Sequence, residues 1–171
     1  MEQKIKDAIA QSVRDFHLPR YEEIPDVGLY LDQATRYVAD YLAPLDSVSI
    51  TGSMVSNYVK KGLVDNPVRK QYNRRQIAYL MFIAVAKTSL TLENIQLLLQ
   101  VGMQAYDEKK AYDYFCQEFE NVLFFIFGLK DSVEHVGREK SDEKTMLRNT
   151  IITVAHKIYL DKYFSALSER T

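Results

Sequence analysis

Residues 74–87 constrain the fold of this chain most strongly, because they are apolar on nearly every side of a helix. The run Ile77–Ala86 carries no charged residue, and Asn73 just before the segment is a residue type that caps helices. A helix that is hydrophobic all round must be covered by other parts of the protein. The run is also shorter than the roughly 20 apolar residues that cross a bilayer. We therefore predict a soluble, all-α fold in which neighbouring helices surround this segment.

Apolar residues recurring at steps of three and four predict helices on both sides of it. Prolines, glycines and capping residues mark where these helices end, and Gly62, Gly128 and Gly137 are candidate breaks. We predict helices over residues 4–16, 29–43, 51–61, 74–87, 104–127 and 141–167, and one that starts at Thr91. Strand content is expected to be very low, at most a two-stranded wing near residues 64–72.

The charge of the chain is unevenly distributed. The whole sequence has 22 basic and 23 acidic residues and a net charge of −1. Between Ile50 and Gln76 the only acidic residue is Asp65, and the basic residues there are Lys60, Lys61, Arg69, Lys70, Arg74 and Arg75. A basic segment within an acidic chain favours a polyanionic partner, and DNA phosphates gain counterion release when cations neutralise them.

The predicted helix over 51–61 divides into two faces. At ~100° per residue, one arc of about 140° holds the polar side chains of Ser53, Ser56, Asn57, Lys60 and Lys61. The opposite arc holds Met54, Val55, Tyr58 and Val59. A solvated surface helix has such a polar face too, but serine, asparagine and lysine also read base edges and hold phosphates.

The cations downstream of this helix favour the nucleic-acid interpretation. Arg69 and Lys70 lie in the predicted wing, and Arg74 and Arg75 open the following helix, where a bound phosphate offsets their unfavourable position in the helix dipole. We expect Lys60, Lys61, Arg69, Lys70, Arg74 and Arg75 to grip phosphates and Ser53, Ser56 and Asn57 to read bases. Tyr58 is expected to pack the helix, and its hydroxyl is a further candidate contact to phosphate.

Three segments of this region resemble the DNA-binding domain of MerR-family regulators. Met54–Leu63 is similar to the second helix of that domain, which ends in a charged-Gly-Leu step before the wing. Tyr72–Leu80 resembles the segment after the wing, and Leu90–Leu98 resembles the helix that closes the domain. The resemblance implies a winged helix-turn-helix that binds double-stranded DNA, and a homodimer formed by the helices after it.

The chain also resembles a bacterial family known as domain-of-unknown-function family 1836, over about residues 16–100. The strings that carry this resemblance are Leu18-Pro19, Ile24-Pro25, Leu29–Gln33, Met54–Lys60 and Pro67–Tyr72. The family resemblance implies a set of related proteins and no particular activity.

Together these features predict three parts and a function. Residues 1–28 form a helix and loop, 29–101 a winged helix-turn-helix, and 102–171 a C-terminal helical hairpin that dimerises. The expected function is sequence-specific binding of double-stranded DNA by a transcription regulator. Ser56 stands where MerR proteins carry an arginine that contacts DNA, and the predicted wing is short. A protein-interaction module that keeps the winged fold without binding DNA therefore remains the alternative.

The C-terminal third carries two apolar patterns. Tyr112, Phe115, Phe119, Val122, Ile126 and Leu129 recur at steps of three and four, as in a coiled-coil seam. The last helix has Leu147, Ile151, Val154 and Ile158 on one side and Leu160, Phe164 and Leu167 on another. These patterns are typical of a hairpin core within one chain, of a homodimer interface, or of an aromatic pocket for an apolar effector, and no particular effector is indicated.

Other classes of site find little support. No phosphate-binding glycine loop, HExxH motif or nucleophile elbow is present, so no enzyme activity is expected. Cys116 is the only cysteine, and His17, His135 and His156 lie far apart in the sequence. We therefore expect no disulfide, metal or cofactor. The polar N-terminus has no signal-peptide core, so we expect a cytoplasmic protein without a membrane partner.

Overall fold

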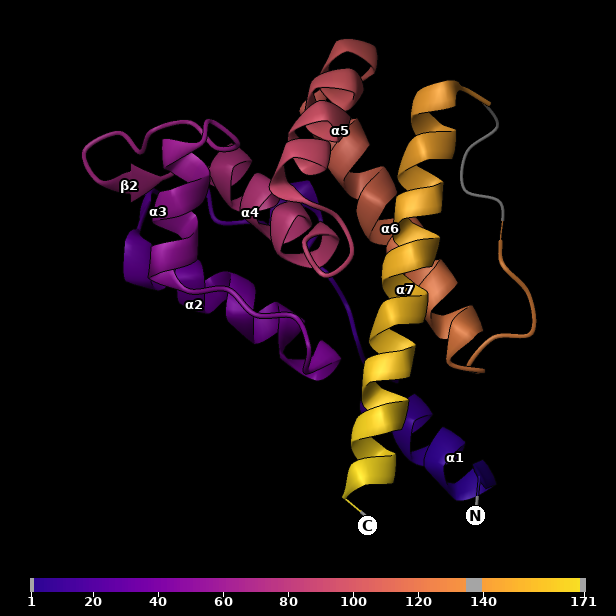
Figure 1. The fold of residues 1–171 in the computed structure, drawn as a ribbon. Helices are drawn as coiled ribbons and strands as arrows, with labels where there is room; N and C mark the ends of the chain where they lie inside the picture. The colour runs from indigo at the N-terminus through magenta and orange to yellow at the C-terminus, as the bar shows by residue number, and fades with distance from the viewer. Residues whose placement is uncertain (1, 135–139, 170–171) are drawn as a thin grey trace.

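The computed structural model describes residues 2–134 and 140–169, which form helices and one small sheet (Figure 1). The α-helices are α1 (Glu2–Ser12), α2 (Leu31–Leu42), α3 (Gly52–Lys60), α4 (Arg74–Ala86), α5 (Leu92–Ala105), α6 (Glu108–Ile126) and α7 (Asp142–Ser168). Short 3-10 helices occur at η1 (Tyr21–Glu23) and η2 (Ala43–Leu45), and strands at β1 (Leu29–Tyr30) and β2 (Gln71–Tyr72). The prediction of an all-α fold with at most a small wing is confirmed. His135 and Gly137 lie outside the described residues.

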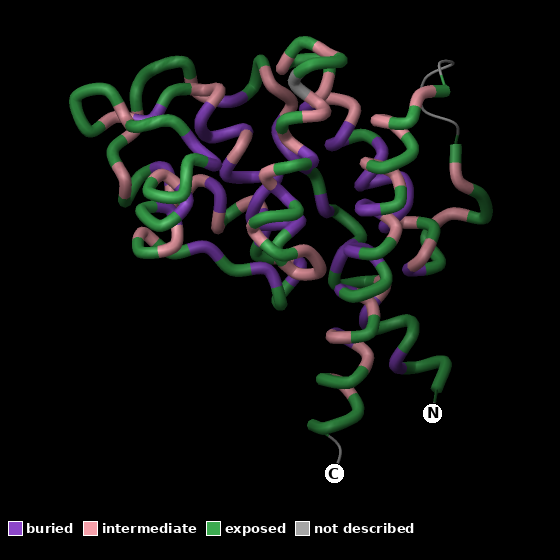
Figure 2. The backbone as a smooth tube through the Cα atoms, turned by 45° about the horizontal axis from the view of Figure 1, so that its top comes forward, coloured by how far each residue is buried: buried purple, intermediate pink, exposed green. Residues whose placement is uncertain are grey.

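Helix α4 is the centre of the fold. Between Gln76 and Ala86 every residue except Tyr79 is buried, which confirms that this segment is covered on nearly all sides. Helix α4 packs against α2, α6 and α7. Figure 2 shows exposed residues along the outer loops and along the end of α7 that projects beyond the body. The all-round apolar sequence of α4 therefore holds the N-terminal and C-terminal helices together.

The helix starts follow from local capping. The side chains of Thr51, Asn73, Thr91, Asp107 and Ser141 each accept a backbone N–H from the first turn of the helix that follows. Each cap satisfies an N–H group that has no partner within its helix.

Three predicted boundaries are corrected. The predicted helix over 29–43 begins at Leu31, because Leu29 and Tyr30 pair with β2 instead. The predicted helix over 104–127 begins later, at Glu108, since Gln104 and Ala105 complete α5, Tyr106 is extended and Asp107 caps α6. Helix α1 stops at Ser12, whose hydroxyl donates to the Ile9 carbonyl oxygen (2.7 Å) and so competes with the helical hydrogen bond.

The C-terminal helices α6 and α7 pack side by side. On α6, Phe115, Phe119 and Val122 are buried, and on α7 Ile151, Val154 and Ile158 are buried. Parallel stacking of Phe115 and Phe119 (centroids 5.8 Å apart) continues this aromatic core along α6. The predicted intrachain hairpin core is therefore present.

Buried carboxylates join the loops to this hairpin. Glu120 of α6 accepts the backbone N–H of Leu18 (2.8 Å) and pairs with the Arg20 guanidinium (2.6 Å). Glu118 pairs with Arg148 of α7 (3.1 Å). These contacts fix the segment after α1 against α6 and tie α6 to α7. Among the described helices, none combines the length and apolar character needed to cross a bilayer.

Candidate nucleic-acid interface

Helix α3 has the two faces that its sequence predicts. Ser53, Ser56, Asn57 and Lys60, together with Lys61 at the C-cap, are exposed. The opposite face packs inward through the completely buried Val55 and Tyr58. Gly62, with φ of +78°, ends the helix in the predicted left-handed conformation, and Leu63 N–H donates to the Tyr58 carbonyl oxygen (2.9 Å). Helix α3 is thus anchored on one side and presents amide, hydroxyl and ammonium groups to solvent on the other.

Tyr58 belongs to the packed face, as expected, and its hydroxyl is not placed to act as the further candidate contact to phosphate. The residue is completely buried, and its hydroxyl has no hydrogen-bond partner among the described residues. Burial raises the pKa of this phenol, and the Lys87 ammonium lies 5.5 Å from the ring centroid. Tyr58 therefore orients α3 and does not reach a ligand on its polar face.

A two-residue turn presents Arg69 and Lys70. Val68 and Gln71 close it through two backbone hydrogen bonds (3.1 and 2.9 Å). Arg69 and Lys70 have φ of +51° and +63°, which is the type I′ geometry that hairpins with a right-handed twist require. Such turns favour Asn and Gly, and each non-glycine residue in this region costs roughly 1–2 kcal/mol. The backbone thus holds two exposed cations at the tip of the hairpin at a cost in stability.

The hairpin is fixed to the body by its second strand. In the antiparallel β1–β2 sheet, Leu29 pairs with Tyr72 and Tyr30 with Gln71. Gly28 is required beside this sheet, because a Cβ atom there would lie 2.6 Å from Gln71 Oε1. The strand β2 therefore pairs with a strand from the segment before α2, which the sequence did not predict. In Figure 1, α3 and this hairpin lie at the end of the molecule away from α7.

Arg74 is turned toward the loop before β1. Its Nε donates to the Ile24 carbonyl oxygen (2.8 Å), and Nη1 lies 3.4 Å from Glu22 Oε2. The guanidinium carbon lies 5.8 Å from the centroid of the Tyr21 ring. The fixed orientation of Arg74 connects the loop to α4, so its charge is already partly neutralised.

Arg75 is paired as well. Its Nε lies 2.6 Å from Glu108 Oε1 and its Nη1 lies 3.6 Å from Asp65 Oδ2. The Tyr79 hydroxyl beside it raises the pKa of the Arg75 guanidinium, and Glu108 and Asp65 act in the same direction. Arg75 therefore joins α4 to α6 and to the loop after α3.

The ten residues predicted for the site divide into three groups. Seven are exposed on α3 and at the tip of the hairpin, namely Ser53, Ser56, Asn57, Lys60, Lys61, Arg69 and Lys70. Tyr58 is buried, and Arg74 and Arg75 are held by carboxylates. Within residues 2–134 and 140–169, Lys60, Lys61, Arg69 and Lys70 form no ion pair with a carboxylate.

Sequence reasoning missed several residues of this surface. Val68 is 71% exposed beside Arg69, and Tyr30 is exposed on β1, so the hairpin carries apolar side chains next to its cations. It also missed Glu22 and Glu108, which form ion pairs with Arg74 and Arg75. These partners lie more than 30 residues away in sequence, and no local pattern links them. The exposure of Tyr30 was missed because the sequence predicted a helix over 29–43 where the structure has β1.

Comparison with known proteins gives one match. A family model described as "Domain of unknown function (DUF1836)" matches residues 19–115. No curated protein and no solved structure matches the chain. The matched span begins in the loop before η1, contains α2–α5 and ends within α6. Among the described residues, no cluster of three or more His, Cys, Asp or Glu side chains is arranged to hold a metal ion.

Proposed function

The chain belongs to the family described as Domain of unknown function (DUF1836), and from that premise we propose that residues 29–101 are a MerR-like winged helix-turn-helix that binds double-stranded DNA. In this proposal the protein is a transcription regulator and not an enzyme. Helix α3 is the recognition helix, and the hairpin around Arg69 and Lys70 is the wing. The observation that carries the proposal is the strained turn that keeps these two cations exposed.

The strain supports a role for the side chains that the turn displays. Backbone held in a sparsely populated region persists where the surrounding structure enforces it, and it occurs often at binding sites. Asn and Gly would form the same type I′ turn without this cost, yet Arg69 and Lys70 occupy it. Two long cationic side chains gain little from packing at a hairpin tip, whereas phosphate contacts give them a function.

The polar face of α3 supports base reading. The side chain of Asn57 can donate and accept toward an adenine edge, and the hydroxyls of Ser53 and Ser56 can bond to either strand. Lys60 and Lys61 follow at the end of the same face. A helix that exposes short polar groups and ends in ammonium groups suits insertion into the major groove, which is flanked by the two sugar–phosphate backbones.

Binding of labelled duplex DNA tests this proposal. Fluorescence anisotropy over a range of salt concentrations should show affinity falling steeply with salt. Four phosphate contacts per chain, made by Lys60, Lys61, Arg69 and Lys70, correspond to a log–log slope of roughly −3 to −4 for one chain and about twice that for a dimer on paired half-sites. Selection from a random duplex pool should then enrich one motif. Binding that any DNA competes away equally would argue against a sequence-specific regulator.

The carboxylate pairs of Arg74 and Arg75 favour a second candidate. With these two cations neutralised and Val68 and Tyr30 exposed, the same face suits a protein partner. A protein-interaction module with this fold would bind no duplex at low salt, so the titration described above separates the two candidates.

We further propose that the protein is a homodimer formed through α7. Leu160, Phe164 and Leu167 lie at steps of four and three and are 45%, 59% and 41% exposed. These residues lie in the C-terminal part of α7, and Figure 2 shows the C-terminal end of the chain projecting beyond the body. A self-complementary helical stripe would cover these apolar side chains, and a two-fold dimer would present two α3 helices to paired half-sites.

A further inference from the structure

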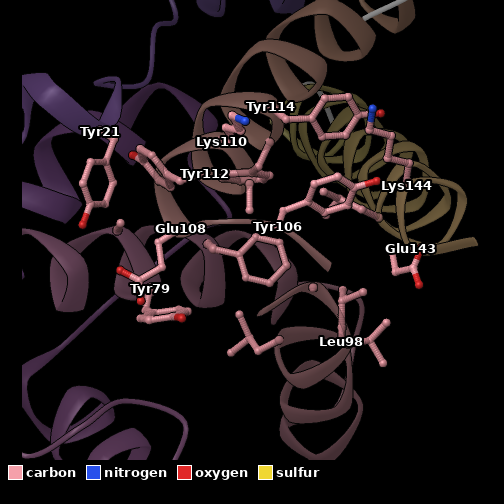
Figure 3. A pocket seen from close by; sticks show the side chains of 18 of the residues that line it. Tyr21, Tyr79, Leu98, Tyr106, Glu108, Lys110, Tyr112, Tyr114, Glu143 and Lys144 are labelled. Carbon is pink, nitrogen blue, oxygen red and sulfur yellow. The ribbon is translucent and has the colours of Figure 1, made fainter. Parts of the chain in front are cut away.

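A cavity of about 300 Å³ lies where α4, α5, α6 and the start of α7 meet. Its walls are mainly aromatic and aliphatic, and Figure 3 shows side chains from these helices surrounding a common space. Residues that form the walls include Tyr79, Phe82, Leu98, Tyr106, Tyr114 and Phe115. This volume lies at the lower end of the roughly 300–1,000 Å³ of small-molecule sites, which are typically apolar with a few polar groups.

The aromatic walls are held by one another. Phe82 and Phe115 meet edge to face with centroids 5.0 Å apart, and Phe115 stacks on Phe119. The Tyr106 hydroxyl and the Ser141 hydroxyl lie 2.9 Å apart, which fixes one tyrosine wall to the N-cap of α7. Preformed walls of this kind favour a rigid, flat ligand, because little ordering is needed on binding.

Most charged groups at the edge of the cavity already have partners, and Glu143 is the lining carboxylate that forms no ion pair with the described residues. Arg75 is paired with Glu108, and the Lys110 ammonium lies 3.8 Å from Asp107. The Lys144 ammonium lies 5.6 Å from the ring centroids of both Tyr106 and Tyr114. An anionic ligand would have to displace one of these pairings and a cationic ligand would find only Glu143 as a partner, whereas an uncharged ligand needs no counter-charge in an apolar cavity.

From these contacts we infer that the cavity binds an uncharged, flat aromatic molecule of one or two fused rings. The rings of the ligand contact Phe82, Phe115 and the tyrosine walls, and the ion pairs of Arg75 and Lys110 lie at the rim. This site is separate from the DNA surface proposed above and does not depend on that function.

Gly102 offers a way to close the cavity without disturbing its walls. It lines the cavity from α5, and a Cβ atom built on it would have no atom within 4 Å. A larger side chain at this position therefore extends into open space. Gln100 lies on the same helix and is exposed outside the cavity, so a leucine there is a matched control.

Indole is a suitable probe, because the chain contains no tryptophan and indole fluorescence can be excited apart from tyrosine. Titration of the full-length protein into indole should show saturable binding of one molecule per chain. Gly102→Leu should weaken this binding at least tenfold, and Gln100→Leu should leave it within twofold. Ala111→Leu fills the same cavity from α6 and should repeat the loss should Gly102→Leu fold poorly.

Charged analogues test the chemical class. Indole-3-acetate and tryptamine should both bind at least fivefold more weakly than indole. Absence of saturable indole binding to the wild type would overturn the inference, as would equal binding by both folded cavity-filling variants. Tighter binding of either charged analogue would overturn the assignment to uncharged ligands.

Discussion

Lys162 on α7 forms an ion pair with Asp46, which lies in the connection between α2 and α3. The Lys162 side chain is 4% exposed, whereas that of Asp46 is 71% exposed. Asp46 has φ of +58°, so the connection is bent sharply where the carboxylate meets the ammonium. The long C-terminal helix is thereby fastened to the turn that precedes the proposed recognition helix.

Asp46→Asn should lower the free energy of unfolding by about 1–2 kcal/mol, because it leaves the Lys162 ammonium buried without its counter-charge. Asparagine has nearly the same shape as aspartate and is likewise enriched at positive φ, so the change isolates the charge. Denaturation by urea measures the loss. The double variant Asp46→Asn with Lys162→Met should be more stable than Asp46→Asn alone, since methionine carries no charge to desolvate. Equal stability of the wild type and Asp46→Asn would show that the pair contributes nothing.

Replacing the hairpin tip should separate stability from binding. Arg69→Asn combined with Lys70→Gly supplies the residues that type I′ turns favour, so the free energy of unfolding should rise by about 1 kcal/mol. The same change removes two cations and should weaken DNA binding. Thermal denaturation and duplex titration report the two effects. A less stable variant would contradict the interpretation of strain at the tip.

Neutralising single cations should change the salt dependence of DNA binding. Lys60→Gln and Arg69→Gln should each flatten the log–log slope by about one unit. Arg74→Gln should change it by less, because Glu22 and the Ile24 carbonyl oxygen already hold that guanidinium. Asn57→Ala should instead reduce discrimination between sequences by about 1–3 kcal/mol. Unchanged slopes for Lys60→Gln and Arg69→Gln would remove these residues from the interface.

Cys116 should make stability fall with pH in alkaline solution. Burial raises the pKa of its thiol from 9.0 to about 12. Between these values the unfolded chain loses the thiol proton and the folded chain keeps it, so folding stability declines by about 1.4 kcal/mol per pH unit from this group. Comparing the pH slopes of the wild type and Cys116→Ala cancels other titrating groups. Equal slopes would mean that the folded thiol ionises normally.

Disrupting the exposed stripe of α7 should yield monomers. Leu160→Glu and Phe164→Glu place charges where two copies would meet, and neither residue is buried within the chain. Light scattering should give twice the 19.9 kDa chain mass for the wild type and the single mass for the variants. A monomeric wild type would remove the proposed dimer, and Ser165→Glu on the same helix turn, outside this stripe, serves as the control.

The helices could be predicted because their signals are local. Apolar spacing located α3, α4 and α7, and side-chain caps such as Thr51, Asn73 and Ser141 placed their starts within one residue. The boundary between α5 and α6 was predicted near residue 104 and lies at Tyr106 and Asp107, because the Asp107 cap fixes where α6 begins. The β1 strand was missed because pairing of Leu29 with Tyr72 depends on a partner 43 positions later.

The candidate site was predictable only in part for the same reason. The exposure of Ser56, Asn57 and Lys60 follows from helical periodicity, which a sequence displays directly. The pairing of Arg75 with Glu108 depends on how α6 returns to α4, and charge alone could not show it. The cavity likewise arises from the packing of four helices, and the sequence indicated only that aromatic residues were abundant there.

Arg75 belongs to two surroundings at once, since it lines the cavity and also meets Asp65 in the loop that follows α3. A ligand that changed how Arg75 is held would therefore also act on the loop that follows the proposed recognition helix. Thermodynamic linkage makes such an effect mutual: whatever factor the ligand imposes on duplex affinity, the duplex must impose on the ligand. The single guanidinium of Arg75 would then be sufficient to couple ligand binding in the cavity to duplex binding.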